Sequence, residues 1–448
     1  DDLILDLLGY LDSKDLSTLA QASHAVRIYC YTDQLWKELF LNEAQTAIKF
    51  TKNWRTSYIC WKLETESNLS VDGKQCDFTG GVKIPGSLFS DFLFHAWTCA
   101  TAKIEDSWVQ VENVDRKENL SLEEFVSQYE RPNIPVIITD VVHKWPAFSK
   151  WQVDFLCQEY GEVPFHAGGF TFQLKDYFIY SSESVEDQPL YIFDKHFGEK
   201  APGLVDDYKV PEYFSEDLFS LLGNDRPDYR WLIIGPAKSG SSFHKDPNCT
   251  SAWNAVVRGR KKWILFPPEV VPPGVYPSDD GLELATPVSL IEWFLQFYRE
   301  TKSWKVQPKE CVVDEGEMIF VPRGWWHMVL NLEESIAITQ NYVSNTNLAS
   351  VLSFLKNEPH LISGLPYEKR LNLHQSFFEV LKIKVPELLD NIKEEEIKEK
   401  MKVKSQSNLV MTTTTINRKE QNQTAAQLFE ESKSSTVISS SFSFGFDL

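Results

Sequence analysis

The feature that most constrains the fold of this chain is a series of short β-rich runs between residues 230 and 343, with no helical pattern between them. The runs combine β-branched and aromatic residues, and they end at Gly, Pro, Asn or Asp, which are typical of turns. They cover residues 230–235, 253–266, 317–330 and 335–343. Because parallel strands need long crossover connections, this pattern predicts an antiparallel sandwich or barrel and an α+β class that is mainly β.

Helical patterns precede this β-rich region. In residues 1–45, apolar side chains recur at helical spacing in three groups, so we expect three short helices, with caps at Asp12 and Thr32. Residues 46–107 are rich in tryptophan without a clear period, and we expect them to form a linker or packing region.

Other signals set the limits of the β-rich domain. A capping box at Ser121 and Glu124 predicts a helix, which is followed by a buried strand over residues 134–142. After the domain, residues 346–404 have a helical pattern. Residues 405–448 are mostly Ser, Thr, Gln, Asn and Lys, and they offer too few core residues to offset the entropy of ordering. We expect a disordered tail there.

Composition excludes several classes of protein. Sixty-four acidic residues against 45 basic ones give a formal charge of −19, which argues against nucleic-acid binding and favours basic partners. No stretch contains the roughly 18 apolar residues of a membrane-spanning helix, and the start of the chain lacks the features of a signal peptide. The seven cysteines are scattered and never form a CxxC pair. We therefore expect an intracellular protein, in the nucleus or the cytoplasm.

Three residues of the β-rich region have the chemistry of a metal site. A non-haem iron oxygenase binds Fe(II) with two imidazoles and one carboxylate, which leaves the other positions for a bidentate cosubstrate and dioxygen. His244 and Asp246 are two positions apart, so on a strand their side chains lie on the same face. His327 follows a Pro-Arg-Gly turn, and we expect it to complete the set. The alternative is that His327 is hydrogen-bonded within an aromatic core, beside Trp325 and Trp326.

Read with their flanks, these residues resemble the JmjC (jumonji) family of 2-oxoglutarate-dependent oxygenases, in particular the branch of the bifunctional arginine demethylase and lysyl hydroxylase. The resemblance is specific in separated segments: residues 137–151, 189–194, 207–211, 229–231, 250–255, 262–267 and 324–341. It implies a double-stranded β-helix (jelly-roll or cupin) barrel over residues 108–345, with its core at about 189–345 and the iron inside its open end.

The resemblance also implies contacts to 2-oxoglutarate. These fall on Tyr191, Ser241, Asn254, Lys261 and Thr339, and Ser241 replaces a threonine of the family. The distal carboxylate needs a fixed cation and hydroxyl donors, which Lys261 and Thr339 would supply. The basic run 258–262 can also be read as a surface patch or localisation signal, but strand alternation directs at least one of its cations inward. We further expect Asn341 near the metal.

Residues 1–45 resemble an F-box, because Asp33-Gln34-Leu35-Trp36 matches the Asp-x-Leu-Trp ending of that motif. In the F-box family this segment docks a Skp1-type adaptor of a ubiquitin ligase. The resemblance implies an N-terminal helical F-box-like module, and we expect Leu7, Leu35 and Trp36 to form its docking face.

Together these resemblances imply an Fe(II)- and 2-oxoglutarate-dependent dioxygenase that uses O2 to hydroxylate lysine, or to demethylate arginine or lysine, in proteins. Trp325 and Trp326 would shield the site from water. Two alternatives stay open: an F-box substrate adaptor whose barrel binds targets without turning them over, and a structural metal-binding barrel. The substrate would be a protein with a basic side chain. C-terminal helices would form a homodimer interface, as in many jumonji relatives.

Overall fold

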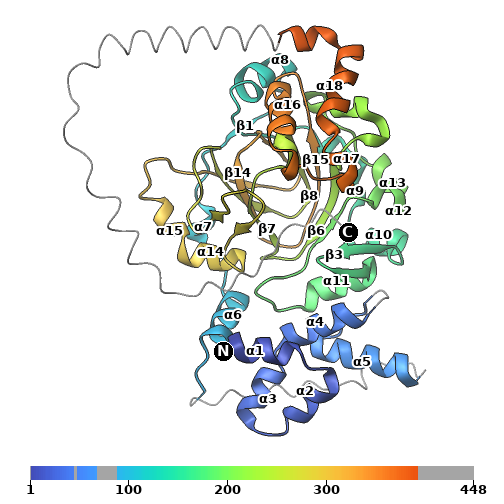
Figure 1. The fold of residues 1–448 in the computed structure, drawn as a ribbon, viewed down its shortest axis with the longest axis vertical. Helices are drawn as coiled ribbons and strands as arrows, with labels where there is room; N and C mark the ends of the chain where they lie inside the picture. The colour runs from blue at the N-terminus through green and yellow to red at the C-terminus, as the bar shows by residue number, and fades with distance from the viewer. Residues whose placement is uncertain (1, 45–47, 68–87, 392–448) are drawn as a thin grey trace, which may run out of the picture. The chain divides into compact units, whose positions relative to one another are not determined.

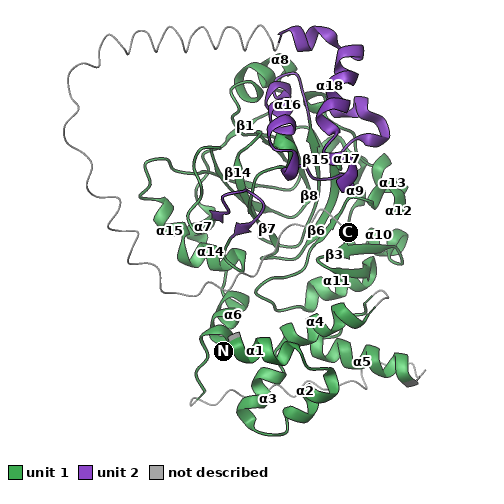
Figure 2. Cartoon of the chain, viewed as in Figure 1, with its two compact units in different colours: residues 1–215, 228–275, 286–342 green, residues 216–227, 276–285, 343–448 purple. Residues whose placement is uncertain are grey.

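The structure, a computed structural model, describes residues 2–44, 48–67 and 88–391. The expected disordered tail, residues 405–448, lies outside the described residues. The chain divides into two compact units (Figure 2). The first contains residues 1–215, 228–275 and 286–342, and the second contains residues 216–227, 276–285 and the chain from residue 343 onward.

Two sheets form the centre of the first unit (Figure 1). Within the described residues, the larger sheet has nine strands, in the order β1 (Asp115–Lys117), β2 (Val136–Ile138), β13 (Met318–Val321), β8 (Ser251–Arg258), β15 (Ser335–Tyr342), β6 (Arg230–Gly235), β5 (Ile192–Asp194), β3 (Pro164–Ala167) and β4 (Phe170–Gln173). The smaller has four, in the order β12 (Lys309–Val313), β9 (Lys261–Phe266), β14 (Trp326–Asn331) and β7 (Gly240–His244). Neighbouring strands are antiparallel except β1 and β2.

The two sheets face each other across one apolar cluster. Val256 and Ile319 reach it from the larger sheet, and Trp263, Val313 and Val329 reach it from the smaller one. Because side chains alternate along a strand, the neighbours two positions away from these residues point into the same space. This arrangement confirms the predicted mainly-β architecture of two antiparallel sheets.

Side-chain alternation also decides which polar residues enter the space between the sheets. Asn254 lies two positions before Val256 on β8, and Lys261 lies two positions before Trp263 on β9. His327 lies two positions before Val329 on β14. All three residues come from different strands, and all three were expected to be site residues.

The strand predictions hold at β6 and β15 and need correction elsewhere. The predicted run 253–266 forms two strands, β8 and β9, which are joined by a turn at Gly259 with a φ of 78°. The region between β9 and β12 was expected to lack helices, and that was wrong. It contains α14 (Leu290–Gln296) and α15 (Tyr298–Thr301), and Ser289 caps α14 by accepting a hydrogen bond from Glu292 N.

The N-terminal region has four helices where three were expected: α1 (Asp2–Gly9), α2 (Ser13–Leu19), α3 (His24–Cys30) and α4 (Asp33–Glu43). Asp12 caps α2 as predicted, and its carboxylate accepts a 2.8 Å hydrogen bond from Asp15 N. The expected middle helix is divided because Ser23 begins a new one: its hydroxyl accepts a 3.1 Å hydrogen bond from Val26 N.

These N-terminal helices share a core with the larger sheet. The Trp54 ring, at the start of α5 (Trp54–Ser67), stacks on Phe170 of β4 with 4.8 Å between ring centroids. Phe50 contacts Tyr180 of α11 (Leu174–Glu183) edge to face, at 4.9 Å. The helical region is therefore built into the first unit through one continuous apolar cluster.

Further helices of the first unit are α6 (Asp91–Thr101), α7 (Asp106–Val109), α8 (Leu122–Phe125), α9 (Pro146–Lys150), α10 (Val153–Tyr160), α12 (Phe197–Lys200) and α13 (Pro202–Asp206). The capping box at Ser121 and Glu124 is present at the start of α8. The second unit contains α16 (Leu348–Asn357), α17 (Tyr367–Arg370), α18 (Leu373–Lys384) and the strand pair β10 (Tyr276–Pro277) and β11 (Leu284–Ala285). In the described part of the chain, no helix has the length and apolarity needed to cross a membrane.

Candidate metal centre

His244, Asp246 and His327 come together in the structure. One nitrogen from each ring and one carboxylate oxygen all lie within 4.8 Å of one another. His244 ends β7 and pairs directly with His327 on β14, and their ring centroids are 4.2 Å apart. Among the residues that the structure describes, this is the one group of three or more His, Cys, Asp or Glu side chains with metal-site spacing.

A bulge in β7 directs side chains toward this site. His327 pairs with His244 and Val329 pairs with Ser241, so β14 advances by two residues where β7 advances by three. The extra residue of a bulge changes which face the following side chains take. As a result Ser241 and His244 lie on the same face as their partners, although they are an odd number of positions apart.

Asp246 lies beyond the end of β7, in an extended conformation with a φ of −59° and a ψ of 144°. The expectation that one strand carries both His244 and Asp246 was therefore wrong for the carboxylate. The extended backbone after the strand still brings its side chain to the two histidines.

The two histidines are oriented in the same way. Nδ1 of His244 lies 2.7 Å from the carbonyl oxygen of Ser242, and Nδ1 of His327 lies 3.1 Å from that of Trp325. Because a carbonyl oxygen only accepts hydrogen bonds, each Nδ1 carries the proton and each Nε2 carries the lone pair. Burial lowers the pKa of both rings to about 4, so both are neutral at pH 7 and suited to bind a metal.

The carboxylate of Asp246 is held on one side only. Asn341 donates from Nδ2 to Oδ1 of Asp246 at 3.1 Å and to Oγ1 of Thr250 at 2.8 Å. Oδ2 of Asp246 is buried and has no hydrogen-bond partner. Burial raises the pKa of this carboxyl. Since a buried carboxylate oxygen without a donor is costly, the three side chains fit a divalent cation bound by two imidazoles and a carboxylate.

Lys261 is a buried cation with no carboxylate beside it. Its side chain is 2% exposed, and its Nζ donates a 2.8 Å hydrogen bond to Oδ1 of Asn331. Burial lowers its pKa to about 7. Lys262, which points to the opposite face of β9, instead forms a 3.2 Å ion pair with Glu310. Of the two lysines on β9, Lys261 is therefore the one that offers a charge to an anionic ligand in the space between the sheets.

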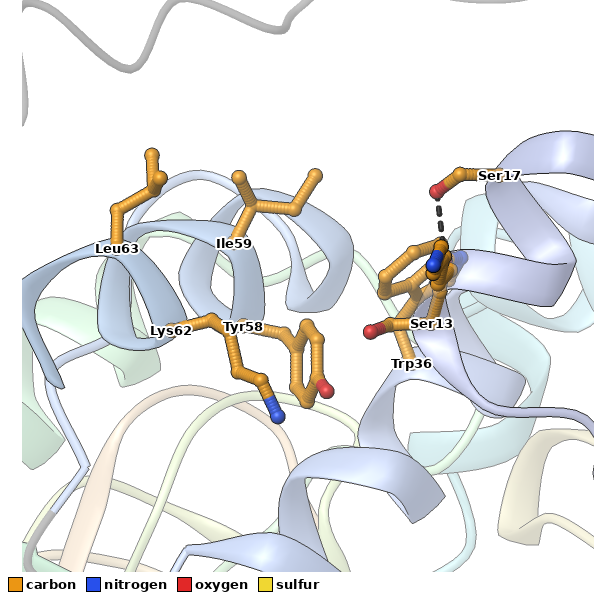
Figure 3. Close-up of a pocket in the computed structure, with 8 residues that line it drawn as sticks. Ser13, Ser17, Trp36, Tyr58, Ile59, Lys62 and Leu63 are labelled. Carbon is orange, nitrogen blue, oxygen red and sulfur yellow. Dashed lines mark hydrogen bonds between the residues drawn. The ribbon is translucent and has the colours of Figure 1, made fainter. Parts of the chain in front are cut away.

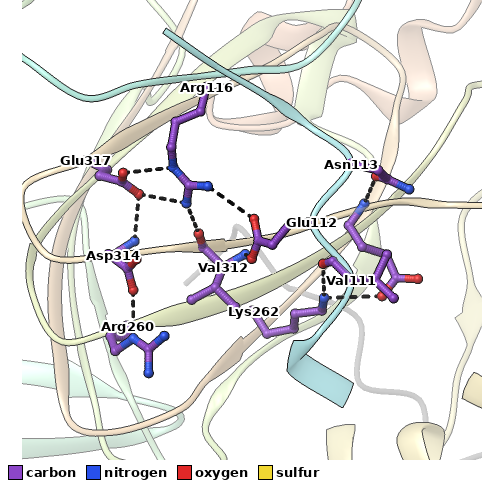
Figure 4. Close-up of polar contacts among 10 residues, drawn as sticks. Val111, Glu112, Asn113, Arg116, Arg260, Lys262, Val312, Asp314 and Glu317 are labelled. Carbon is purple, nitrogen blue, oxygen red and sulfur yellow. Dashed lines mark hydrogen bonds and ion pairs between the residues drawn. The ribbon is translucent and has the colours of Figure 1, made fainter. Parts of the chain in front are cut away.

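The other cations of the basic run have partners on the protein. Nε of Arg260 lies 2.7 Å from a carboxylate oxygen of Asp314. Nζ of Lys262 also donates to the carbonyl oxygen of Val111 at 3.0 Å, within the polar network of Figure 4. The reading of this run as a surface patch therefore fits Arg260, which is exposed, but not the two lysines.

The remaining expected cosubstrate residues form two pairs. The Tyr191 hydroxyl lies 3.3 Å from Oγ of Ser241. Asn254 lies opposite Thr339 in the β8–β15 pair, and Oδ1 of Asn254 is buried without a hydrogen-bond partner. The Thr339 hydroxyl donates to the carbonyl oxygen of Trp253 at 2.9 Å, so it would have to rotate to donate to a carboxylate.

Trp325 and Trp326 are both buried, but they cannot serve the same site. Trp325 belongs to the cluster between the sheets, and its indole nitrogen donates to the carbonyl oxygen of Asn133 at 2.9 Å. Trp326 precedes His327 on β14 and so faces the other side. Its ring lies under the ammonium group of Lys245, at 4.7 Å. The expected shielding role is therefore restricted to Trp325.

Sequence reasoning missed Ser239, Thr250 and Asn331. Thr250 and Asn331 contact expected site residues, and Ser239 contacts Asn331 at 2.8 Å. Asn331 was treated as turn punctuation after a predicted strand, and the strand pairing that places it against Lys261 has no local signal.

The expected docking face on residues 1–45 needs correction. Leu35 and Trp36 are 4% and 1% exposed, so they belong to the core and cannot contact a partner. Leu7 is 60% exposed on α1, beside Leu3 at 70%, and Tyr10 after the helix is 87% exposed. The apolar surface of this region is therefore on α1.

A separate hollow of about 200 Å³ lies among the N-terminal helices (Figure 3). Its lining comes from α2, α4 and α5: Ser13, Lys14, Ser17, Trp36, Tyr58, Ile59, Lys62 and Leu63. Lys62 and the Tyr58 hydroxyl both bind Glu43, at 2.6 and 2.8 Å. None of the expected metal or cosubstrate residues lines this hollow, so it is distinct from the metal centre.

Comparisons with known proteins agree with this geometry. Residues 171–347 match a family model described as a cupin-like domain. The arginine-specific demethylase JMJ22 of Arabidopsis thaliana is 48% identical over 386 residues, which cover 84% of this chain and 74% of the relative. The bifunctional arginine demethylase and lysyl-hydroxylase psr-1 of Caenorhabditis elegans is 38% identical over 61% of this chain and 69% of its own length. The human 2-oxoglutarate and iron-dependent oxygenase JMJD4 is 32% identical over 53% of this chain and 63% of its own length.

Proposed function

Because the chain belongs to the cupin-like JmjC family of 2-oxoglutarate- and iron-dependent oxygenases, we propose that it hydroxylates or demethylates basic side chains of proteins. The observation that carries this proposal is that a metal-binding triad and a buried lysine both lie in the space between the two sheets. Two neutral imidazoles and a carboxylate meet at one point, and a buried cation without an anionic partner lies in the same space between the sheets.

His244, Asp246 and His327 would hold the iron through two Nε2 atoms and one carboxylate oxygen. When bound, iron and 2-oxoglutarate supply oxidation by O2: 2-oxoglutarate becomes succinate and CO2, and one oxygen atom enters a C–H bond of the substrate. Lys261 would bind the distal carboxylate of 2-oxoglutarate, and Tyr191, Ser241, Asn254 and Thr339 would complete the contacts to it. Trp325 excludes water from one side of this space.

The names of the relatives and the negative charge of the chain support a basic protein side chain as the substrate. JMJ22 is named an arginine-specific demethylase, and psr-1 is named for both arginine demethylation and lysyl hydroxylation. A formal charge of −19 favours the approach of a basic protein. If the oxidised carbon is a methyl group on nitrogen, the hydroxylated product releases formaldehyde and the methyl group is lost. We propose that the protein acts in the nucleus or the cytoplasm.

The proposed oxygenase function gives a role to both the triad and Lys261, whereas the two alternatives do not. A structural metal barrel accounts for the triad but gives no role to the buried ammonium of Lys261. An adaptor that only binds its targets needs neither feature.

We also propose that α1 docks a Skp1-type partner through Leu3, Leu7 and Tyr10, because these apolar side chains are exposed together. This docking would accompany catalysis and not replace it.

A homodimer is proposed through the helices of the second unit. Tyr367, Leu371 and Ile383 are 69%, 61% and 74% exposed on or near α17 and α18. Apolar side chains at this exposure are suited to contact a second copy. Sedimentation of the full chain tests this, and a monomer at micromolar concentration would refute it.

The test of the proposed activity is anaerobic titration of the Fe(II)-loaded protein with 2-oxoglutarate, followed by the visible absorption of the chelate. We expect a saturable band in the unsubstituted protein and none in His244→Ala. Basic peptides carrying methylarginine or lysine are then supplied with O2. Succinate with formaldehyde indicates demethylation, and succinate with a peptide mass gain of one oxygen indicates hydroxylation. A protein that binds iron but gives no band would refute the proposal.

A further inference from the structure

Lys261 and Asn331 form a direct cross-strand pair. They are partners in the β9–β14 register, so their side chains leave the sheet on the same face and next to each other. Asn331 is fully buried and Lys261 nearly so. The 2.8 Å contact from Nζ to Oδ1 of Asn331 uses one of the three hydrogen atoms of the ammonium group. The other two remain available to a ligand.

The orientation of the Asn331 amide is determined by its other neighbour. The Ser239 hydroxyl donates its one hydrogen atom to the carbonyl oxygen of Pro236 at 2.6 Å. Its oxygen can therefore only accept from Asn331, which donates from Nδ2 at 2.8 Å. With the amide nitrogen directed to Ser239, the amide oxygen must face Lys261. Lys261 therefore donates to Asn331, Asn331 donates to Ser239, and Ser239 donates to the backbone.

Two backbone hydrogen bonds also fix the position of Asn331. Asn331 N donates to the carbonyl oxygen of Ser239, and Lys238 N donates to the carbonyl oxygen of Asn331, both at 2.8 Å. Gly235 makes room for the contact: a Cβ atom there would lie 2.8 Å from Nδ2 of Asn331 and 2.9 Å from Cβ of Tyr191. Asn331 and Tyr191 are thus packed against the turn at residues 235–239, and Lys261 is held through Asn331.

We propose that Asn331 is a positioning residue, which holds the Lys261 ammonium toward the distal carboxylate of 2-oxoglutarate while leaving its positive charge uncompensated. This inference rests on the proposed function and adds to it. An amide supplies a hydrogen-bond acceptor without a negative charge, so the ammonium is fixed in place and the cosubstrate provides the only counter-ion. A carboxylate at position 331 would have nearly the same shape, but it would pair with Lys261 internally and compete with the ligand.

Asn331→Asp tests this directly, because it keeps the shape of the side chain, adds a negative charge beside Lys261 and replaces only the donor to Ser239 by an acceptor. We measure the dissociation constants of two ligands by the anaerobic titration with Fe(II). One is 2-oxoglutarate, and the other is 2-oxobutanoate, which chelates through the same keto acid but lacks the distal carboxylate. Asn331→Asp is expected to weaken 2-oxoglutarate at least about tenfold and 2-oxobutanoate less than about twofold. Asn113→Asp is the matched control, since Asn113 accepts a hydrogen bond from Glu310 N outside the site.

Ser239→Ala provides a second variant that adds no charge. It removes the partner of the Asn331 nitrogen and frees the amide to turn, so we expect about two- to fivefold weaker 2-oxoglutarate binding with 2-oxobutanoate unchanged. If Asn331→Asp does not fold, Ser239→Ala alone tests the positioning role of Asn331. Equal effects on both ligands, or no effect on either, would overturn the role of Asn331 and leave the proposed function intact. Failure of the unsubstituted protein to bind 2-oxoglutarate would overturn both.

Discussion

His244 and His327 are direct cross-strand partners, with 4.2 Å between ring centroids, and each ring is oriented by the carbonyl oxygen two residues before it. The pairing brings two imidazoles, the proposed metal ligands, together from strands that are far apart in sequence. The repeated carbonyl contact makes both rings present the same nitrogen. The site is therefore organised by strand backbones before any metal arrives.

Asp246→Asn should separate the stability of the metal-free protein from metal binding. Without metal, the buried Oδ2 of Asp246 has no hydrogen-bond partner, so removing the charge should stabilise the apoprotein by roughly 1–3 kcal/mol. With metal, the unsubstituted protein should gain stability by mass action and the variant should gain almost none. Thermal melts with and without Co(II) measure both effects. A variant that retains the full metal-induced rise in Tm would contradict the assignment of this ligand.

Binding of 2-oxoglutarate should take up a proton above pH 7. Burial lowers the pKa of Lys261 to about 7, and a bound carboxylate favours its charged form. At pH 8.5 most of the free protein therefore holds neutral lysine, and affinity should fall as pH rises above 7. Calorimetry in two buffers of different ionisation enthalpy measures the uptake, which should be close to one proton at pH 8.5. Asn331→Asp should show much less, because its carboxylate already charges the lysine.

The lowered pKa of Lys261 also makes the stability of the metal-free protein depend on pH. Between about pH 7 and 10.5 the unfolded chain holds a proton on Lys261 that the folded chain has released. The unfolded state then binds more protons, so stability rises with pH across that window. Below about pH 7 both states hold the proton, and the full cost of burying the charged lysine remains. Lys261→Met should remove this rise in urea unfolding measured at pH 7 and pH 9. An unchanged slope would show that the lysine is charged throughout.

Trp54→Ala should destabilise the whole first unit. Trp54 is fully buried, stacks on Phe170 and donates from its indole nitrogen to Glu186 at 2.9 Å. Replacing such a side chain typically costs about 3–5 kcal/mol. We expect a single unfolding transition that shifts as a whole by fluorescence and circular dichroism. Two transitions, of which only one moves, would show that the N-terminal helices unfold as an independent module.

Asp33 should make the stability of the N-terminal helices depend on pH. Burial raises the pKa of Asp33 to about 6, with Glu186 adding to the shift and Lys37 opposing it. The folded state therefore holds a proton that the unfolded state releases between about pH 4 and 6, so stability falls as pH rises through this range. Asp33→Asn should raise stability by roughly 3 kcal/mol at pH 7.5 and have little effect at pH 4. An equal effect at both values would exclude titration of Asp33 as the cause.

Replacing Leu3 and Leu7 by Asp tests the proposed docking of a Skp1-type partner. Both side chains are mostly exposed, so the double variant should fold and retain turnover while its binding to the partner falls at least about tenfold. Leu282→Asp is the control, because Leu282 is 55% exposed and belongs to the second unit but to neither proposed contact surface. Unchanged capture of the partner by the α1 variant would remove this surface from consideration.

Local pattern was sufficient for part of the fold, and pattern together with the family resemblance identified the three side chains that the structure brings together. Strands β6 and β15 were predicted at their observed positions, since β-branched runs and turn residues act over a few neighbours. The Pro-Arg-Gly turn before His327 was predicted for the same reason, and Gly324 has the positive φ, 73°, that such a turn requires. Strand alternation predicted that at least one cation of the run 258–262 points inward, and the structure shows that Lys261 is buried there.

What the sequence could not decide depends on contacts between distant segments. Leu35 and Trp36 look like a docking motif, but they are buried in the apolar cluster that the N-terminal helices share with the larger sheet. Asn331 looks like a turn residue, and only the β9–β14 register places it against Lys261. The bulge that brings Ser241 and His244 to one face exists only relative to β14. Periodicity and turn residues are properties of neighbouring positions, whereas burial and strand register arise from the free energy of packing the whole chain.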